Sequence, residues 1–326
     1  DKYLIDTINE EYLYTLTVPV ITKLADIIQT DSRASVEYLQ SELPNLTVNS
    51  SVTGVDIIST ANKRLEEWQK RKENPDEYFI PTGFKELDEI IGGWSKGEEL
   101  AVIFARTGQG KSWILIKSLE HAWKMNEVVG LLEPEMSAIK TGYRFDTLSA
   151  NFSNRSLMRG EEVEDYEKYI NELKSKDLPL YVAHPIDFNK RVTVSKLRSW
   201  VQTNNIGILA IDGVTYLTDE RYQRGDRRTI SEDLMDLSIE LKIPIIIVAQ
   251  SNREGAKQGE QAPQLEHIRD SDGIAFNAST VISVMQKGPV IEVNISKNRN
   301  GRTGDKLLYY CDIDKGIFRY VPSEDS

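Results

Sequence analysis

Eight consecutive residues have the types and the spacing of a phosphate-binding loop. They read Ala105-Arg106-Thr107-Gly108-Gln109-Gly110-Lys111-Ser112. Gly108 and Gly110 lack Cβ atoms, so successive backbone N–H groups can curl around phosphate oxygens. Lys111 can reach the β- and γ-phosphates of a nucleotide, and the Ser112 hydroxyl can ligate Mg²⁺. The pattern therefore predicts a P-loop, although Ala105 stands where the usual motif has its first glycine.

The residues on either side of this loop supply the elements that must position it. The apolar run from Leu100 to Phe104 predicts a buried strand, and residues 113–119 have helical spacing. A helix that begins at the loop points its positive end at the bound phosphate. We therefore expect an α/β fold built around a P-loop NTPase core with a mostly parallel central sheet.

A carboxylate follows the next buried strand, which the sequence predicts from Val128 to Leu132. This strand ends in Glu133-Pro134-Glu135. A carboxylate at the C-terminal end of a strand beside a P-loop can polarise a water for attack on the γ-phosphate. We assign this role to Glu135, and Glu133 is the competing candidate.

Two later strands also end in polar residues. The run from Ile206 to Ile211 ends in Asp212, and the run from Ile243 to Ala249 ends in Gln250. Asp212 has the Walker B pattern and is expected to hold the Mg²⁺ shell through water or Ser112. Gln250 can touch the γ-phosphate while the loop behind it touches something else, so we expect it to act as a relay.

Three polar segments contain basic residues. Residues 218–228 hold four arginines, and the loop from Ser251 to Asp272 is long enough that we expect it to be functional or disordered. The segment from Lys297 to Gly304 lies between two predicted strands, and its glycines indicate a hairpin with a basic rim. The end of the chain is therefore expected to be β-rich.

Composition limits the class of protein. The chain has 326 residues, of which 40% are hydrophobic, and this length predicts one domain of roughly 230–250 residues with a smaller appendage. The single cysteine, Cys311, excludes an internal disulfide and fits a reducing compartment. No apolar run is long enough for a membrane span, so we expect a soluble, intracellular protein with no membrane partner.

The charge is strongly acidic overall. A formal net charge of −11 disfavours a polyanionic partner unless basic residues gather locally in a ring or cleft. The histidines His121, His184 and His267 lie far apart and lack the spacing of a zinc site. We interpret all three as ordinary surface or core residues.

The N-terminal part reads as helical. Residues 1–46 have apolar positions at three- and four-residue spacing, with Asp31-Ser32 as an N-cap inside the segment. A polar stretch at 47–53 follows, and residues 55–72 form an amphipathic helix whose apolar stripe needs a surface in its own domain or in a neighbouring subunit. The expected division is a helical segment at 1–46, a linker with its helix at 47–78, and an ATPase domain at 79–326.

The order of these motifs resembles the RecA-like motor domain of DnaB-type replicative DNA helicases over residues 79–320. The matching segments are Ile80-Pro81-Thr82-Gly83-Phe84 with Leu87-Asp88, Ala105-Arg106 with Gly110-Lys111-Ser112, Glu135-Met136-Ser137, Ile268-Arg269-Asp270-Ser271, and Lys297-Asn298-Arg299-Asn300-Gly301. Two positions depart from the family pattern. Asp272 stands where a glycine is common, and residues 212–217 differ from the usual aromatic-rich run. Residues 1–46 resemble only the last helices of the family's N-terminal domain, which implies a short or truncated domain.

The resemblance implies a mechanism for the nucleotide site. ATP and Mg²⁺ would be bound by Lys111, Ser112 and Asp212. Glu135 would orient the attacking water, and Gln250 would link γ-phosphate occupancy to loop position. The segment that begins at Lys297 matches the part of the family that supplies a Lys finger and an Arg finger, here Lys297 and Arg299, to the neighbouring subunit.

The resemblance also implies partners. A homo-hexameric ring would thread single-stranded DNA past two loops, and a helicase loader and a primase would be further partners. The residues expected at the DNA are Arg221, Arg224, Arg227, Arg253, Arg269 and Asp270. The helix at 55–72 occupies the place of the family's linker helix, which docks on an adjacent subunit. The location implied is the bacterial cytoplasm, for a bacterial or a phage-encoded protein.

Two other functions share parts of this pattern. A RecA-type recombinase or another DNA-dependent ATPase has the same core and differs in assembly. A nucleotide-regulated interaction module would bind a partner with little turnover. The helix at 55–72 and the late Lys-x-Arg pair favour the helicase over the first alternative, and Glu135 argues against the second.

Overall fold

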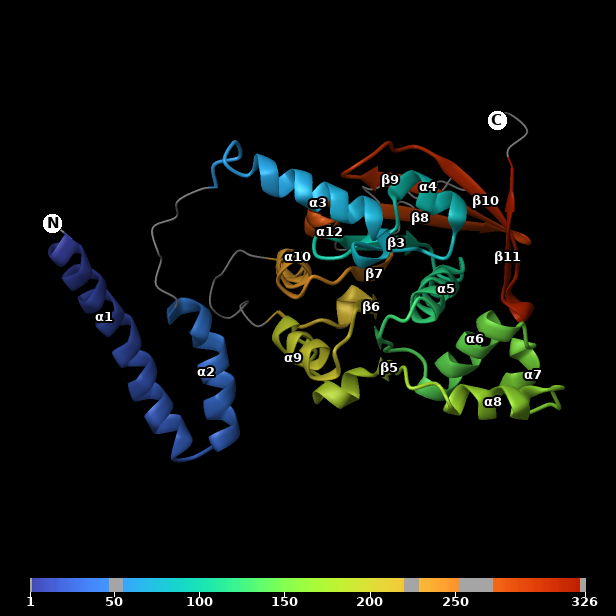
Figure 1. Ribbon diagram of the computed structural model, residues 1–326. Coiled ribbons are helices and arrows are strands. Elements are labelled where there is room, and N and C mark those ends of the chain that lie inside the picture. Colours follow the sequence, from blue (N-terminus) through green and yellow to red (C-terminus); the bar gives the residue numbers. More distant parts are fainter. Residues whose placement is uncertain (1, 47–54, 220–228, 252–271, 323–326) are drawn as a thin grey trace. The chain divides into compact units, whose positions relative to one another are not determined.

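The computed structural model describes residues 2–46, 55–219, 229–251 and 272–322 (Figure 1). Contacts divide the chain into two compact units, Asp1–Gln69 and Lys70–Ser326. The division between residues 69 and 70 lies between the two boundaries expected from the sequence, at residues 46 and 78. Among the described residues, no helix combines the length and the apolar character that crossing a membrane requires.

The first unit contains two long helices. Helix α1 spans Lys2–Ile28 and α2 spans Ser32–Leu46, which confirms the helical reading of this part. The Asp31 carboxylate accepts the backbone N–H groups of Arg33 at 2.9 Å and Ala34 at 3.0 Å. Asp31 therefore caps α2, because its side chain satisfies donors that lack a partner in the first turn.

Helix α3 is shorter than the sequence indicated. It spans Ala61–Glu73 rather than residues 55–72. Before it, the Asp56 carboxylate accepts the N–H of Ile58 at 2.9 Å, and the Thr60 hydroxyl donates to the Ile57 carbonyl at 2.8 Å. Short polar side chains that bind nearby backbone in this way compete with helical hydrogen bonds, so the apolar stripe begins outside the helix.

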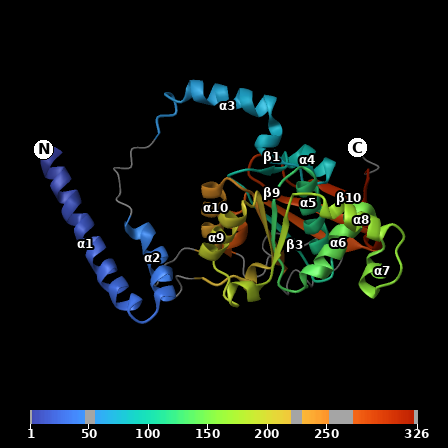
Figure 2. The ribbon, with the colours of Figure 1, turned by 60° about the horizontal axis from the view of Figure 1, so that its bottom comes forward.

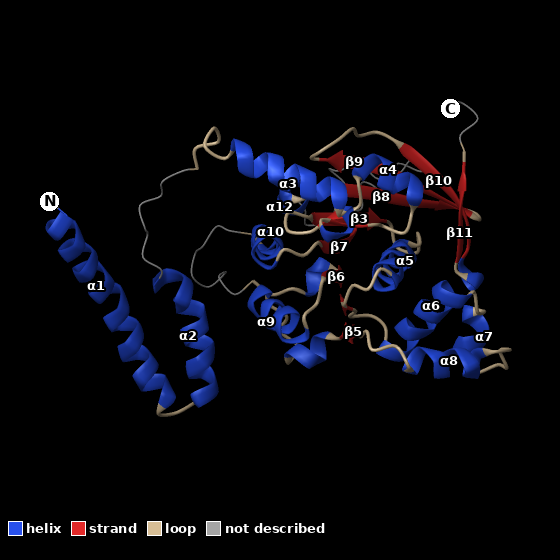
Figure 3. Ribbon diagram, viewed as in Figure 1, coloured by secondary structure: helices blue, strands red, loops and turns tan. Residues whose placement is uncertain are grey.

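A nine-stranded sheet forms the centre of the second unit, in the order β11-β10-β9-β8-β3-β7-β6-β4-β5 (Figure 3). The strands are β3 (Leu100–Ala105), β4 (Val129–Leu132), β5 (Leu180–Ala183), β6 (Ile208–Asp212), β7 (Ile245–Gln250), β8 (Thr280–Lys287), β9 (Val290–Asn298), β10 (Lys306–Asp312) and β11 (Ile317–Val321). The six strands from β8 to β5 in this order run parallel, and β9, β10 and β11 add antiparallel pairs. The expected mostly parallel sheet and β-rich end are confirmed.

Helices cover both faces of this sheet (Figures 1 and 2). They are α4 (Lys85–Ile91), α5 (Lys111–Lys124), α6 (Ala138–Ala150), α7 (Asn154–Arg159), α8 (Tyr166–Lys174), α9 (Val194–Asn204), α10 (Ile230–Leu241) and α12 (Asp272–Asn277). Alternate residues of β3 enter two separate cores: Ile103 packs with α5, and Val102 packs with α9 and α10. Central strands buried on both faces read as continuous apolar runs, which is why the sequence predicted them well.

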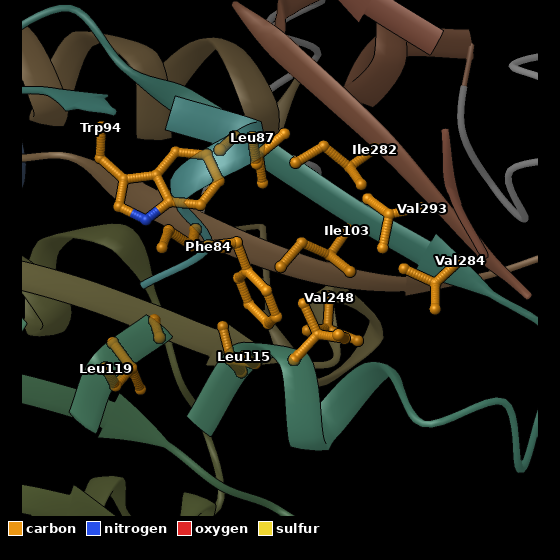
Figure 4. Packing of buried hydrophobic residues seen from close by; sticks show 14 of the residues in the cluster. Phe84, Leu87, Trp94, Ile103, Leu115, Leu119, Val248, Ile282, Val284 and Val293 are labelled. Carbon is orange, nitrogen blue, oxygen red and sulfur yellow. The ribbon is translucent and has the colours of Figure 1, made fainter. Parts of the chain in front are cut away.

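The segment before β3 closes the core beside α5. The Thr82 N–H donates to the Asp88 carboxylate at 2.8 Å, and this bond fixes the turn that leads into α4. Gly83 has φ +84°, and a Cβ there would lie 2.9 Å from the Cβ of His121. Phe84 packs next to Leu115 in this core (Figure 4). Position 83 therefore requires glycine, both for its positive φ and for its close approach to His121.

Two short elements complete this region. Strand β1 (Phe79–Ile80) pairs antiparallel with β2 (Trp94–Ser95), and the one-turn helix η1 (Pro75–Glu77) precedes them. The Trp94 indole N–H donates to the Ser118 hydroxyl of α5 at 2.8 Å. Trp94 is 1% exposed, so its one polar atom is satisfied inside the core.

Candidate nucleotide site

Four neighbouring parallel strands bring the predicted site residues to one edge of the sheet. The order β3-β7-β6-β4 places the P-loop, Gln250, Asp212 and the Glu133 turn at adjacent strand ends. Ala105 pairs with Gln250 in the register of β3 and β7. Because parallel strands present their carboxyl ends at the same edge, these groups face a common space.

The P-loop leads directly into helix α5. Gly108 has φ +76° and Gly110 has φ +81°, values that L-residues with a side chain rarely adopt. The carbonyl of Gly110 accepts the N–H groups of Trp113 at 3.0 Å and Ile114 at 3.1 Å. The helix therefore begins at Lys111, and its first N–H groups remain available for an anion.

Ser112 and Asp212 meet at the expected metal position. The Asp212 carboxylate accepts a hydrogen bond from the Ser112 side chain; burial raises the pKa of Asp212, while this bond and the charge of Lys111 oppose that rise. A hydroxyl and a carboxylate are hard oxygen donors that suit Mg²⁺, which usually takes its remaining ligands from water and phosphate. Within the described residues no group of three or more His, Cys, Asp or Glu side chains could form a full metal cage, and this donor pair fits a shared site with nucleotide.

The structure separates the two glutamates of the β4 turn. Glu133 is 1% exposed, and its carboxylate accepts the backbone N–H groups of Glu135 at 2.9 Å and Met136 at 3.1 Å. Burial and the charge of Asp212 raise the pKa of Glu133, although the two backbone bonds oppose the rise. Glu135 is exposed, and its carboxylate makes no hydrogen bond within the part of the chain that the structure describes. The geometry therefore supports Glu135 as the residue that is free to act on a water.

Arg144 of α6 is a member of the site that the sequence reading missed. The charges of Glu133, Asp212 and Glu135 all act on it, and burial lowers the pKa of its guanidinium against their effect. The guanidinium also lies 5.1 Å from the centre of the Trp113 ring. Helical spacing could have indicated that Arg144 points inward, because position 144 shares a helix face with the buried positions 141 and 148.

Lys297 and Arg299 lie at the opposite edge of the sheet. Thr280 pairs with Asn298, whereas the P-loop end of β3 pairs with Val284 four residues further along β8. Lys297 Nζ donates to the carbonyls of Ala275 at 2.9 Å and Phe276 at 2.8 Å, and Arg299 Nη2 donates to that of Asn277 at 3.3 Å. At roughly 3.3 Å per residue this places them more than about 13 Å from the P-loop of the same chain.

The residues expected at DNA are not among those described. Arg221, Arg224 and Arg227 lie in the undescribed segment 220–228. Arg253, Arg269 and Asp270 lie in the segment 252–271. The described chain resumes with α12 immediately after the second segment, and the C-terminal end of α12 is where Lys297 and Arg299 bind.

Known proteins share this fold. The chain resembles a solved ATPase domain with a TM-score of 0.68 at 22% identity, over 80% of this chain and 98% of that one. It also resembles a structure described as that of a DnaB-like replicative helicase and its interactions with primase, with a TM-score of 0.68 at 20% identity, over 98% of this chain and 79% of that one. These likenesses confirm the RecA-like arrangement of the sheet.

Sequence relatives point the same way. The replicative DNA helicase DnaB of Geobacillus stearothermophilus is 27% identical over 247 residues, which is 71% of this chain and 54% of the relative. That of Helicobacter pylori strain 26695 is 29% identical over 254 residues, 75% of this chain and 51% of the relative. The chain thus spans about half the length of these relatives. The family model described as the DnaB-like helicase C-terminal domain matches residues 79–315, and the chain accordingly belongs to this replicative-helicase family.

Proposed function

We propose that the chain is an ATP-dependent replicative DNA helicase that works as a ring-shaped homo-oligomer on single-stranded DNA. The observation that supports this proposal is the placement of the predicted nucleotide-site residues at two opposite edges of the sheet. The P-loop, Asp212 and Glu135 gather at one edge, and Lys297 and Arg299 lie at the other. A second copy is needed to bring the two halves together.

At the first edge, the chain's own residues bind and orient ATP. Lys111 would neutralise the β- and γ-phosphates, and Ser112 with Asp212 would hold Mg²⁺. The bound metal would supply charge stabilisation to the phosphate oxygens. Arg144 limits the repulsion among the nearby carboxylates before nucleotide arrives, because its positive charge acts on all three.

Glu135 would accept a proton from the attacking water. Its carboxylate is exposed and hydrogen-bond free among the described residues, whereas that of Glu133 is occupied by backbone. A base must be within reach of the water and must not be engaged elsewhere. Gln250, which pairs with Ala105 at the start of the P-loop, would report the γ-phosphate to the segment that follows it.

At the second edge, Lys297 and Arg299 would complete the site of a neighbouring copy. In the single chain their side chains bind backbone carbonyls at the end of α12. Cations supplied in trans to a transferring phosphate typically raise its rate about 10³- to 10⁵-fold. Hydrolysis should therefore depend on assembly, for which a hexamer is the state that the family suggests.

Helix α3 of a neighbouring copy would strengthen this assembly. Leu65 is 54% and Trp68 57% exposed on α3, and an apolar cavity of about 520 Å³ is lined by residues of α5, α6, α8, β4 and β5. The segment at 161–165 that leads into α8 holds four acidic residues, and α3 holds five basic residues against three acidic ones. The apolar lining and the opposite charges thus suit α3 as the occupant.

Single-stranded DNA is the proposed polymer substrate. The arginine-bearing segments 220–228 and 252–271 follow β6 and β7, whose ends form the nucleotide site. A few arginines and backbone amides can hold phosphates on a protein whose overall charge is −11. A primase and a helicase loader are the proposed protein partners, and one structural relative is described with primase.

The test is ATP hydrolysis across protein concentration, with and without single-stranded DNA, in wild type and in Arg299→Ala. We expect turnover to rise with assembly and with DNA, and to fall about 10³-fold or more in the variant. Arg302→Ala is the matched control, because Arg302 lies on the same hairpin, is 73% exposed and pairs with Asp305 at 3.1 Å. Turnover that depends on neither concentration nor Arg299 would contradict the proposal, and open filaments in electron microscopy would favour a recombinase.

A further inference from the structure

The turn that presents Glu135 is held by a histidine from the neighbouring strand. We propose that His184 is a positioning residue that fixes the peptide group preceding Glu135. His184 follows β5, which pairs with β4 through Leu132 and Ala183. Its imidazole Nε2 lies 2.9 Å from the carbonyl oxygen of Pro134. The proposal rests on the assignment of Glu135 as the residue that activates water.

The tautomer of His184 follows from its other contacts. The Nδ1 atom accepts the backbone N–H of Ile186 at 3.2 Å. The proton of a neutral imidazole must then be on Nε2, so the ring donates to Pro134. The backbone N–H of His184 donates to the Asp187 carboxylate at 2.8 Å, in a capping box at the start of the short helix η2 (Pro185–Phe188). The contacts with Ile186 and Asp187 therefore hold the imidazole in an orientation that directs Nε2 at the β4 turn.

The bond to Pro134 acts on a peptide group that is also held at its other end. The carbonyl of Pro134 and the N–H of Glu135 belong to the same peptide unit, and that N–H donates to the Glu133 carboxylate at 2.9 Å. Because the peptide unit is planar, fixing both its oxygen and its hydrogen fixes the plane from which the Glu135 Cα projects. Glu133 is itself tied to β5, since its N–H donates to the Ala183 carbonyl at 2.8 Å.

Among the described residues, His184 is the one hydrogen-bond partner of the Pro134 carbonyl. Pro134 has no N–H, so its carbonyl is its only polar backbone group. The Glu135 side chain is exposed and has no partner among the described residues that would orient it. Its position relative to the P-loop is thus set by the backbone, and His184 supplies one of the two bonds that set it.

The effect of losing this bond should fall on the chemical step. A neutral hydrogen bond of this kind is worth about a two- to tenfold change in an equilibrium constant. His184 belongs to the β5 side of the turn and is bonded to Pro134, Ile186 and Asp187, not to the P-loop. We therefore expect kcat for ATP hydrolysis to fall about two- to tenfold without a change in the KM for ATP.

Two variants separate positioning from stability. Asn in His184→Asn can cap η2 as well as histidine does, but its side chain is too short to reach Pro134. Gln in His184→Gln keeps a longer amide donor for Pro134 and is a poorer cap. We expect the first variant to lose kcat at an unchanged Tm, and the second to keep most of kcat at a slightly lower Tm. If kcat instead follows Tm in both variants, the role is structural only and the proposal fails.

A double variant separates this proposal from the one on which it rests. Adding His184→Asn to Glu135→Gln should leave the residual turnover unchanged, since the side chain being positioned has lost its function. If Glu135→Gln alone leaves turnover intact, the assignment of Glu135 is wrong. If Glu135→Gln abolishes turnover and His184→Asn equals wild type in kcat, only the role of His184 is overturned.

Discussion

The two ends of the parallel strands differ in charge and in what they bind. At the carboxyl ends, the charges of Glu133, Glu135 and Asp212 all act on Arg144, and Lys111 of the P-loop acts on Asp212. At the amino ends, Lys297 and Arg299 bind the carbonyl end of a short helix. The first end gathers carboxylates around one arginine, and the second presents two cations that bind only backbone carbonyls among the described residues.

In the proposed assembly, one chain would carry every group the reaction needs and would still require a neighbour in order to use them. The cations cannot reach the P-loop of their own chain, because the antiparallel pairing of β8 and β9 places them at the wrong edge. A heterologous contact between copies joins unlike surfaces and closes into a ring when the rotation permits. Under this proposal, the pairing of β8 and β9 makes ATP hydrolysis depend on a second copy.

The largest expected effect tests the acidic end. Glu135→Gln should lower ATP turnover about 10²- to 10⁴-fold, because it removes the proton acceptor. Nucleotide affinity should stay close to that of wild type, since the P-loop is untouched; fluorescent-nucleotide titration measures it. Similar losses of turnover and affinity would instead show that Glu135 shapes the binding site.

The division between the two ends can be tested by mixing defective subunits. Lys111→Ala removes the phosphate contact at one end, and Arg299→Ala removes the cation at the other. Each variant alone should hydrolyse very little ATP. Random equimolar mixtures should regain activity at about one interface in four, because only that fraction pairs an intact P-loop with an intact arginine. Mixtures that stay inactive under conditions where subunits exchange would refute the shared site.

The smallest effect concerns the electrostatics of the amino end. Glu99 is 4% exposed, and burial raises its pKa from the ordinary 4.5 to about 7, against the opposing charge of Arg299. The folded protein therefore holds a proton on Glu99 that the unfolded chain releases between these values, so stability falls as pH rises through this window. This group should cost about 3 kcal/mol of unfolding free energy by pH 8.

Glu99→Gln should remove that pH dependence. Urea unfolding at pH 5 and pH 8 measures it, and the free energy of unfolding of the variant should rise relative to that of wild type as pH rises. Glu98→Gln is the matched control, because Glu98 is the exposed neighbour in the chain. An equal pH dependence in wild type and Glu99→Gln would show that Glu99 is already ionised at pH 5.

Much of the fold and part of the site follow from the sequence. Buried parallel strands are apolar on both faces, so β3, β6 and β7 and the polar residues at their ends are visible as runs that stop at a charge or an amide. The P-loop is a short continuous segment, and its conformation depends on the positive φ angles that its own glycines allow. These features depend on neighbours in sequence, which is why a linear reading finds them.

Other features depend on which segments meet in space. No local pattern shows that the Glu133 carboxylate is occupied by the backbone of its own turn, or that three carboxylates from the ends of two strands act on Arg144. His184 has the sequence context of an ordinary residue, because no local pattern links it to Pro134, 50 positions away. The start of α3 was misplaced because Asp56 binds backbone in competition with the helix.

Strand β9 has a mechanical consequence. Near its first end, Ile291 lies where a Cβ on Gly110 would approach its Cδ1 to 3.1 Å, and its last residues lead to Lys297 and Arg299. Nine extended residues make a rod of about 30 Å, held by neighbours on both sides. In the proposed assembly, a shift of the P-loop on nucleotide binding would therefore press on a strand whose far end carries the two cations expected to serve the next subunit. Because coupling between two binding sites is reciprocal, nucleotide bound at the neighbouring copy would act back on this P-loop through the same strand.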